Sequence, residues 1–232
     1  MEAFPIKTIS IEEHFPQLKE IPEYPETLQM RGSLKRIANT TLITIVGSRK
    51  CTPYGKQVCE ILIKGLAGYP ITIVSGLAYG IDAIAHRAAI DNGLPTIAFP
   101  GSGLNEDVLY PKQNRNLAED ILKSGGILLS EFENHISAAP WNFPLRNRLE
   151  AGIADMVIVI EAATKSGTLI TARLGTEYNK TVGAVPGPIT SPTSAGANWL
   201  LQLGAVPITC SEDILRELNF RLLDELPFPH WQ

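Results

Sequence analysis

The stretch ITIVSGLAYGIDAIAH, residues 71–86, decides the fold class. Its first four residues form an uninterrupted apolar run, which is typical of a buried strand. Ser75, Gly76 and Gly80 then form a turn of small residues, and apolar residues at helical spacing follow up to about residue 92. A strand that leads through such a turn into a helix places backbone N–H groups where they bind an anion. The stretch predicts one strand–turn–helix unit with an anion site at the turn.

The same unit recurs along the chain. Short apolar runs alternate with amphipathic segments of helical period, the pattern of a parallel sheet built from βαβ units and covered on both faces. We therefore expect an α/β fold with a doubly wound, mostly parallel sheet and helices on both faces. The expected strands are 42–46, 71–74, 96–99, 127–130, 155–162, 182–185 and 205–208, and the expected helices are 53–68, 79–92, 112–124, 168–178, 195–203 and 211–218.

The texture of the sequence changes near residue 41. Residues 1–40 contain four prolines and scattered charges, so they are predicted to be an irregular N-terminal extension. Residues 41–218 are predicted to form one Rossmann-like domain, and residues 219–232 a C-terminal tail.

Composition narrows the class of protein. The 232 residues are 44% hydrophobic and 19% charged, enough for a substantial core, and the net charge is −4. Any nucleic-acid site must therefore be a local basic patch. The three cysteines are few and unclustered, which fits a reducing compartment. No apolar run approaches the roughly 18 residues that span a membrane. We expect a soluble cytoplasmic protein without membrane contact.

Small residues follow five of the predicted strands. In open α/β sheets, ligands bind outside the carboxyl ends of the strands, and glycine and serine allow backbone N–H groups to approach a ligand closely. A single glycine turn is explained by packing, but five at one edge of a sheet favour a phosphate site. The five stretches are GSRK (47–50), SGLAYG (75–80), PGSG (100–103), ATKSGT (163–168) and PGP (186–188).

The usual nucleotide and metal motifs are missing from the sequence. GSGLNE, residues 101–106, has Glu106 where a dinucleotide motif needs its last glycine, and there is no P-loop. No His-Glu-x-x-His or Cys-x-x-Cys motif indicates a metal, and no Gly-x-Ser-x-Gly motif indicates a hydrolase. The expected ligand is a phosphate that belongs to neither a dinucleotide nor a magnesium triphosphate.

The segment WNFPLRNRLEAGIAD, residues 141–155, combines two aromatic residues with two arginines around Asn147. Arginine binds phosphate through two parallel hydrogen bonds, and aromatic rings beside arginine suit the stacking of single-stranded bases. The alternative is that Trp141 and Phe143 belong to the core and that one arginine pairs with a carboxylate such as Glu161.

The chain resembles the DNA-processing protein A family (DprA/Smf). The resemblance rests on YPETLQMRG (24–32), IVGSRKCTPYG (45–55), SGLAYGIDAIAH (75–86), YPKQNRNL (110–117), SE (130–131), FPLRNRLEAGIAD (143–155), VIVIEAATKSGTLITA (157–172) and the segment 185–205, which begins VPGPI and ends GANWLLQLGA. It implies an extended Rossmann-like domain that binds single-stranded DNA without catalysis and without a cofactor or metal. It also implies a homodimer that assists loading of a RecA-type recombinase in natural transformation.

Site residues follow from the same resemblance. Pro140 stands where family members commonly carry a lysine, so Lys165 is a candidate replacement for that charge. The residues implied to contact DNA are Gly47, Ser48, Arg49, Ser75, Gly76, Gly80, Phe143, Arg146, Asn147, Arg148, Lys165, Ser166, Gly167 and Thr168.

Asp82 and His86 lie one helical turn apart and are expected to brace the second loop from within the fold. An Asp–His pair also suits a hydrolase, but no nucleophile accompanies it in sequence. Arg148 is open to either role, DNA contact or structural pairing.

Two further expectations concern partners and alternatives. Trp199, Leu200 and Leu201 in an apolar C-terminal helix are expected to form the dimer contact, unless they cover the domain's own sheet. The alternative functions are a phosphoribohydrolase of nucleoside monophosphates and a carrier of a small phosphorylated ligand. The first wants a catalytic glutamate where this chain has Ala172.

Overall fold

The computed structural model describes residues 4–222, and these residues form a single α/β sheet structure. Its strands are β1 (Lys7–Ser10), β2 (Thr27–Gly32), β3 (Thr41–Val46), β4 (Ile71–Ser75), β5 (Thr96–Ala98), β6 (Ile127–Ser130), β7 (Met156–Val159), β8 (Thr181–Ala184) and β9 (Val206–Pro207). Its helices are α1 (Ile11–His14), α2 (Pro53–Gly65), α3 (Ile81–Asp91), α4 (Arg115–Lys123), α5 (Asn142–Ile153), α6 (Thr168–Glu177), α7 (Ala195–Gln202) and α8 (Ser211–Glu217). Short 3-10 turns lie at Pro16–Glu20, Leu34–Arg36 and Lys112–Asn114.

Within the described residues the strand order is β1-β2-β6-β5-β4-β3-β7-β8-β9. Every neighbouring pair from β6 to β9 is parallel, and the two pairs that involve β2 are antiparallel. The expected mostly parallel sheet is therefore confirmed.

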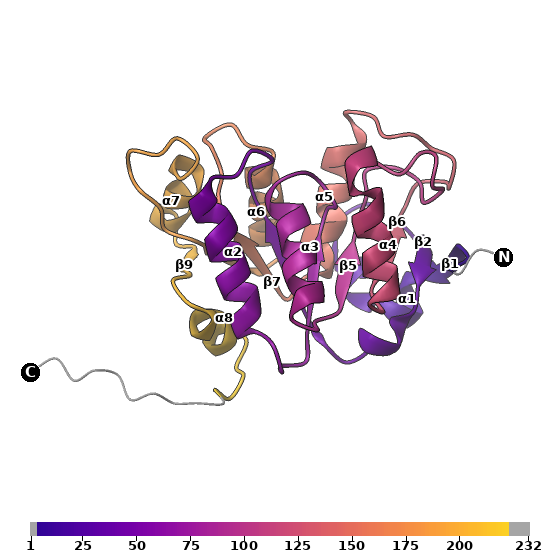
Figure 1. Cartoon of the computed structure of the whole chain (residues 1–232), viewed down its shortest axis with the longest axis horizontal. Coiled ribbons are helices and arrows are strands. Elements are labelled where there is room, and N and C mark those ends of the chain that lie inside the picture. Colours follow the sequence, from indigo (N-terminus) through magenta and orange to yellow (C-terminus); the bar gives the residue numbers. More distant parts are fainter. Residues whose placement is uncertain (1–3, 223–232) are drawn as a thin grey trace, which may run out of the picture.

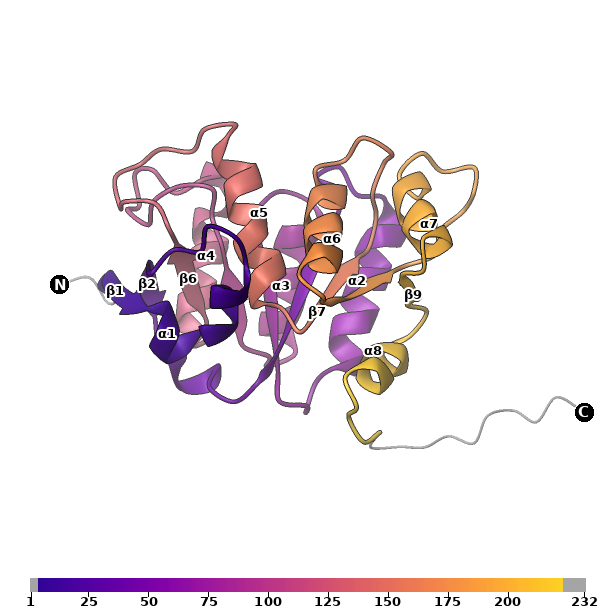
Figure 2. The same cartoon turned by 180° about the vertical axis from the view of Figure 1, so that it is seen from behind.

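Helices cover both faces of the sheet, as expected. Helices α2, α3, α4 and α8 lie in front of it in Figure 1, and α5, α6 and α7 lie in front when the molecule is turned around in Figure 2. Alternate residues of the central strands therefore face helices on one side or the other, which is why these strands are apolar along their whole length.

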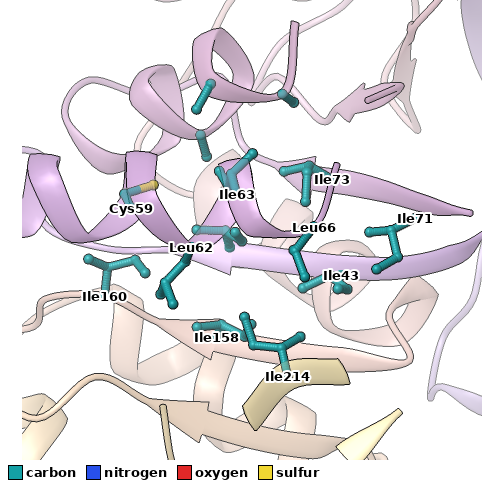
Figure 3. Close-up of a cluster of buried hydrophobic side chains, with 14 of the residues drawn as sticks. Ile43, Cys59, Leu62, Ile63, Leu66, Ile71, Ile73, Ile158, Ile160 and Ile214 are labelled. Atoms are coloured by element: carbon teal, nitrogen blue, oxygen red, sulfur yellow. The ribbon is translucent and has the colours of Figure 1, made fainter. Parts of the chain in front are cut away.

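The largest buried cluster fills the layer between the sheet and helices α2, α3 and α8. Figure 3 shows Leu62, Ile63 and Leu66 of α2 packed over Ile43, Ile71 and Ile158 of the central strands. Burial of each such side chain contributes about 1.5–3 kcal/mol of transfer free energy. This layer holds the carboxyl ends of the strands in fixed positions.

The prediction that residues 1–40 are irregular is wrong. Their second half forms β2, which pairs with β6, and β1 pairs with β2 to extend the same edge of the sheet. Leu28 and Met30 of β2 alternate with the more exposed Thr27 and Gln29, and both pack into a buried cluster. This alternation is the signal of a half-buried strand. The boundary at residue 41 thus marks a change in sequence texture, not a break in the sheet.

Most of the predicted tail, 219–232, lies outside the described residues. Of its first residues, Phe220 packs edge-on against Tyr69 with ring centroids 5.6 Å apart. Among residues 4–222, no helix is long and apolar enough to span a membrane.

Candidate phosphate and nucleic-acid site

A cleft of about 730 Å³ opens at the carboxyl ends of β3 and β7. From these adjacent strands the chain continues in opposite directions along the sheet, β3 to β4 and β7 to β8, so the cleft lies at the topological switch point. This is the position where open α/β sheets bind ligands. Loops after the two strands form two of its walls, along the upper edge of Figure 1, and α5 forms another. Its lining comprises Val46, Gly47, Ser48, Arg49, Lys50, Ala78, Asp82, Pro140, Phe143, Pro144, Arg146, Asn147, Glu150, Ala163, Ser166, Gly167, Thr168, Ile170 and Thr171.

The loop after β3 is held rigidly at both ends. The Ile81 N–H donates to the Ser48 carbonyl at 3.2 Å, which fastens the loop to the start of α3. At its far end, the Thr52 N–H and hydroxyl both donate to the buried Glu161 carboxylate, at 2.8 and 2.5 Å. Gly47 is buried against Ile81 and has no room for a Cβ atom. The loop is therefore preorganised, and its polar tip faces the cleft.

Arg49 is the exposed cation of that tip. Its guanidinium carbon lies 4.9 Å from the centroid of the Phe143 ring, a cation–π contact, and Phe143 in turn meets Tyr110 with ring centroids 5.9 Å apart. The ring of Phe143 rests on Gly101, where no Cβ would fit. Arginine poised over an anchored aromatic ring can bind a phosphate and flank a stacked base.

The loop after β7 leads into α6 at the opposite wall. The Ser166 hydroxyl donates to Thr168 Oγ1 at 2.9 Å, and its oxygen accepts the Thr168 N–H at 3.2 Å. Gly167 precedes the helix, and an added Cβ there would meet no atom within 4 Å. The N-terminus of a helix attracts anions, so this wall also suits a phosphate.

Three charged side chains make up the buried floor of the cleft: Asp82, Arg146 and Glu150, which are 6%, 5% and 1% exposed. Arg146 Nη1 donates to the carbonyls of Gly76 and Phe99, both at 2.5 Å, and so ties α5 to the ends of β4 and β5. Glu150 Oε1 lies 3.1 Å from the same nitrogen, an ion-pair distance. It accepts no hydrogen bond from a described residue, because the N–H groups of Nη1 are directed at the two carbonyls.

Burial is the largest cause of the pKa shifts of the titratable groups at the cleft floor. It raises the pKa of Glu150 to about 8, against the opposing effect of Arg146. Burial also raises the pKa of Asp82, again against Arg146. The pKa of the fully buried His86 is lowered to about 3, first by burial and then by the Arg146 charge, so its imidazole is neutral.

The loop SGLAYG after β4 differs from the anion cradle that its sequence predicts. Ser75 is fully buried, and its hydroxyl donates to the Ile45 carbonyl at 2.7 Å. The Ala78 N–H donates to the Asp82 carboxylate at 3.3 Å, so the protein supplies the anion itself. Gly80 has a φ of +72° and packs against the carbonyls of Ser48 and Arg49. The prediction that Ser75 contacts DNA is wrong, and this loop supports the cleft from behind.

The bracing role expected of Asp82 agrees with its contact to the Ala78 N–H, whereas His86 makes its side-chain hydrogen bond to β5. His86 Nδ1 lies 2.7 Å from the Thr96 hydroxyl, which itself donates to the Ile73 carbonyl. That geometry requires the His86 ring to donate, so it connects α3 to β5. Each side chain thus has its own structural partner.

The two arginines of the segment 141–155 have different surroundings. Arg148 donates to Glu131, with both side chains about 85% buried, and does not line the cleft. Arg148 is therefore a structural residue, one of the two roles that the sequence left open. Asn147 lines the cleft, and Lys165 is exposed on the loop beside it without belonging to the lining.

The predicted dimer residues differ in how much of their side chains is exposed. Leu200 is 7% exposed and packs on its own sheet, so its assignment to an interface is wrong. Leu201 is partly buried against the same cluster, whereas Trp199 is 50% and Leu203 64% exposed. Trp199 is thus exposed on α7, and Leu203 is exposed directly after the helix ends.

Glu150 and Lys50 line the cleft but were not predicted. Glu150 follows the apolar Leu149 in a helix that is otherwise buried on this side, and a buried glutamate in such a position is itself a signal of function. Lys50 directly follows Arg49 and doubles the local positive charge of the loop tip.

The described residues thus define a Rossmann-like protein with a cleft at its switch point. The chain belongs to the DNA recombination-mediator protein A family, whose model matches residues 6–219. It is 40% identical over 216 residues to protein Smf of Escherichia coli, a match that covers 93% of this chain and 55% of that protein. The chain therefore spans about half the length of that relative.

Two solved structures are similar throughout the fold. The DNA processing protein A of Streptococcus pneumoniae superposes with a TM-score of 0.84 at 38% identity, covering 95% of this chain and 76% of that one. The DNA processing protein A of Helicobacter pylori, whose structure describes a single-stranded DNA binding mode, superposes with a TM-score of 0.84 at 30% identity. This match covers 94% of this chain and 99% of that one.

Proposed function

We propose that this chain binds single-stranded DNA in the switch-point cleft and acts by binding, without catalysing a reaction on the strand. The observation that carries the proposal is Arg49, an exposed guanidinium held over the ring of Phe143 at the mouth of the cleft. Family membership and the binding mode described for the Helicobacter pylori protein support it.

Backbone phosphates would contact two walls of the cleft. One is the loop tip of Ser48, Arg49 and Lys50, and the other is the start of α6 at Ser166–Thr168, with Lys165 adding charge beside it. A base would stack against the Phe143 ring. Such a site reads no base edges, so it binds single strands with little sequence preference.

Competition between equally long single-stranded and double-stranded oligonucleotides tests this function by fluorescence anisotropy. We expect preference for the single strand and an affinity whose logarithm falls with the logarithm of salt concentration, by about 0.7 for each phosphate neutralised. Equal binding of the duplex, or an affinity independent of salt, would contradict the proposal.

We further propose a homodimer that hands the strand to a RecA-type recombinase in the cytoplasm, as family membership suggests. The exposed Trp199 on α7 and the exposed Leu203 directly after it precede the edge strand β9 and support a two-fold contact. One substitution would act twice in such an interface. We expect Leu203→Glu to give a folded monomer by light scattering, whereas Leu200→Glu should unfold the domain. A monomeric wild-type chain at tens of micromolar would contradict the dimer alone.

A further inference from the structure

The floor of the cleft contains more negative than positive charge. Asp82 and Glu150 contribute two carboxyl groups, and Arg146 contributes one guanidinium. With both acids ionised, the floor would carry one net negative charge below the site of the proposed phosphates. Charges interact strongly where water is excluded, so the ionised floor would repel a phosphate.

Within residues 4–222, the elements packed around the floor supply no second buried cation. From α3, the neutral His86 and the acid Asp82 face the cluster. From β3, Thr44 donates to the backbone carbonyl of Glu150 and leaves its carboxyl untouched. At the end of β4, Gly76 leaves the space that the Arg146 and Glu150 side chains fill. Arg49 acts on Asp82 from the exposed mouth of the cleft.

The hydrogen bonding of Glu150 favours the neutral acid, although its Oε1 atom lies 3.1 Å from Arg146 Nη1. Its Oε1 atom is buried and accepts no hydrogen bond from a described residue, although a carboxylate would need several. Glu161 provides the contrast within this chain, because it is equally buried at 1% exposure. The Glu161 carboxylate accepts hydrogen bonds from the Thr52 N–H, the Thr52 hydroxyl and the Thr193 hydroxyl.

We propose that Glu150 holds a proton in the DNA complex, so that binding of a phosphate strand in the cleft is coupled to proton uptake at the Asp82–Glu150 pair. This inference rests on the proposed function. The proton comes from solvent and removes the excess negative charge beneath the strand. Glu150 is thus a positioning residue that sets the charge of the cleft without requiring contact with the ligand.

The direction of the pH dependence follows from the buried position. The pKa of Glu150 is raised to about 8 in the free protein, and a nearby phosphate raises it further. Well below pH 8 the proton is already present, and binding takes up none. Above about pH 8, Glu150 is ionised in the free protein and takes up a proton when the strand binds. The affinity should therefore be flat at low pH and fall by up to about tenfold per pH unit above the free pKa.

Isothermal calorimetry in two buffers of different ionisation enthalpy measures the proton uptake directly. The ligand would be a short oligonucleotide of dA and dC, titrated at constant ionic strength at about pH 6.5 and about pH 8.5. We expect the wild-type chain to take up a fraction of a proton, at most one, at the higher pH only. Glu150→Gln should abolish the uptake and retain affinity at high pH. Glu177→Gln, which changes an exposed glutamate at the end of α6, is the control and should keep the uptake.

Carboxyl ¹³C chemical shifts provide a second readout that needs no variant to fold. In the wild-type chain we expect one glutamate to titrate near pH 8. Its pKa should rise when the oligonucleotide binds. Equal uptake in the wild type and in Glu150→Gln, or no uptake in the wild type, would overturn the inference while leaving DNA binding intact. Failure of the wild type to bind the strand at any pH would overturn the proposed function as well.

Discussion

Two glycine-containing loops at the same sheet edge have opposite properties. The loop after β3 ends in an exposed tip, where Arg49 lies over Phe143 and faces the cleft. The loop after β4 is closed by the protein itself, because Asp82 accepts its Ala78 N–H and Arg146 binds the Gly76 carbonyl. Similar sequences thus make a candidate ligand site in one case and a structural joint in the other. What separates them is whether a buried charged side chain already occupies the loop.

The largest effect should come from Gly76→Ala in the closed loop. A Cβ atom at this position overlaps the Arg146 guanidinium and the Glu150 carboxyl. Loss of the hydrogen bonds of a buried charged group costs about 3 kcal/mol or more, so we expect a comparable loss of unfolding free energy in urea. Gly167→Ala is the matched control, since its Cβ enters open space at an ordinary φ of −58°, and it should change stability by less than about 0.5 kcal/mol. Equal losses in both variants would remove the distinction between the loops.

Arg49→Ala should weaken binding without weakening the fold. Charge-assisted hydrogen bonds contribute about 1.5–3 kcal/mol, so we expect at least a tenfold lower affinity for single-stranded DNA and a salt slope reduced by about 0.7. Arg49→Lys should retain only part of the affinity, because lysine lacks the planar guanidinium that forms two parallel hydrogen bonds with a phosphate. Arg148→Ala is the opposite case, because Arg148 pairs with Glu131 and does not line the cleft. Thermal unfolding should show that this variant loses stability, whereas Arg49→Ala should lose affinity in the anisotropy measurement. A large stability loss in Arg49→Ala would contradict the assignment.

Glu150 of α5, which packs against the closed loop, should also give the fold a pH dependence. The pKa of Glu150 is raised from 4.5 to about 8 in the folded chain. Between these values the folded chain holds a proton that the unfolded chain has lost, so stability is greatest at low pH and decreases as pH rises. The decrease is at most about 1.4 kcal/mol per pH unit. Urea unfolding of the wild type and Glu150→Gln at about pH 6 and about pH 8 measures it, and parallel behaviour of the two proteins would show that Glu150 is ionised in the fold.

The smallest effect is expected at the rim of the open side. Trp141 is 70% exposed beside the lining residues Pro140 and Phe143, so a base leaving the cleft can stack on its indole. One stacked base contributes about 1–3 kcal/mol of binding free energy. For a short oligonucleotide, we expect the loss in Trp141→Ala to lie at the lower end of this range. Trp199→Ala, which changes an exposed tryptophan on α7, should leave that affinity unchanged. Equal effects of the two variants would exclude a stacking role for Trp141.

Sequence patterns predicted the central sheet well because its strands are apolar along their whole length. The N-terminal strands were missed because prolines and charges around them masked the alternation of Leu28 and Met30. The switch-point loops were found from their small residues, and Arg49 from the family motif. Sequence alone did not separate Arg146 from Arg148, which lie on opposite sides of the same helical turn and reach the cleft floor and Glu131 respectively. It could not find the Glu150 environment, which depends on where β4 ends.

Photocrosslinking tests most directly whether the strand lies in the cleft between β3 and β7. A thymidine oligonucleotide would be irradiated with the chain and the modified residues identified by mass spectrometry. The account predicts crosslinks at Phe143 and on residues 163–168, both lost when Arg49→Ala is used at the same concentration. Crosslinks confined to the α2–α3 face, such as at Ile61 or Arg87 in the groove there, would contradict it.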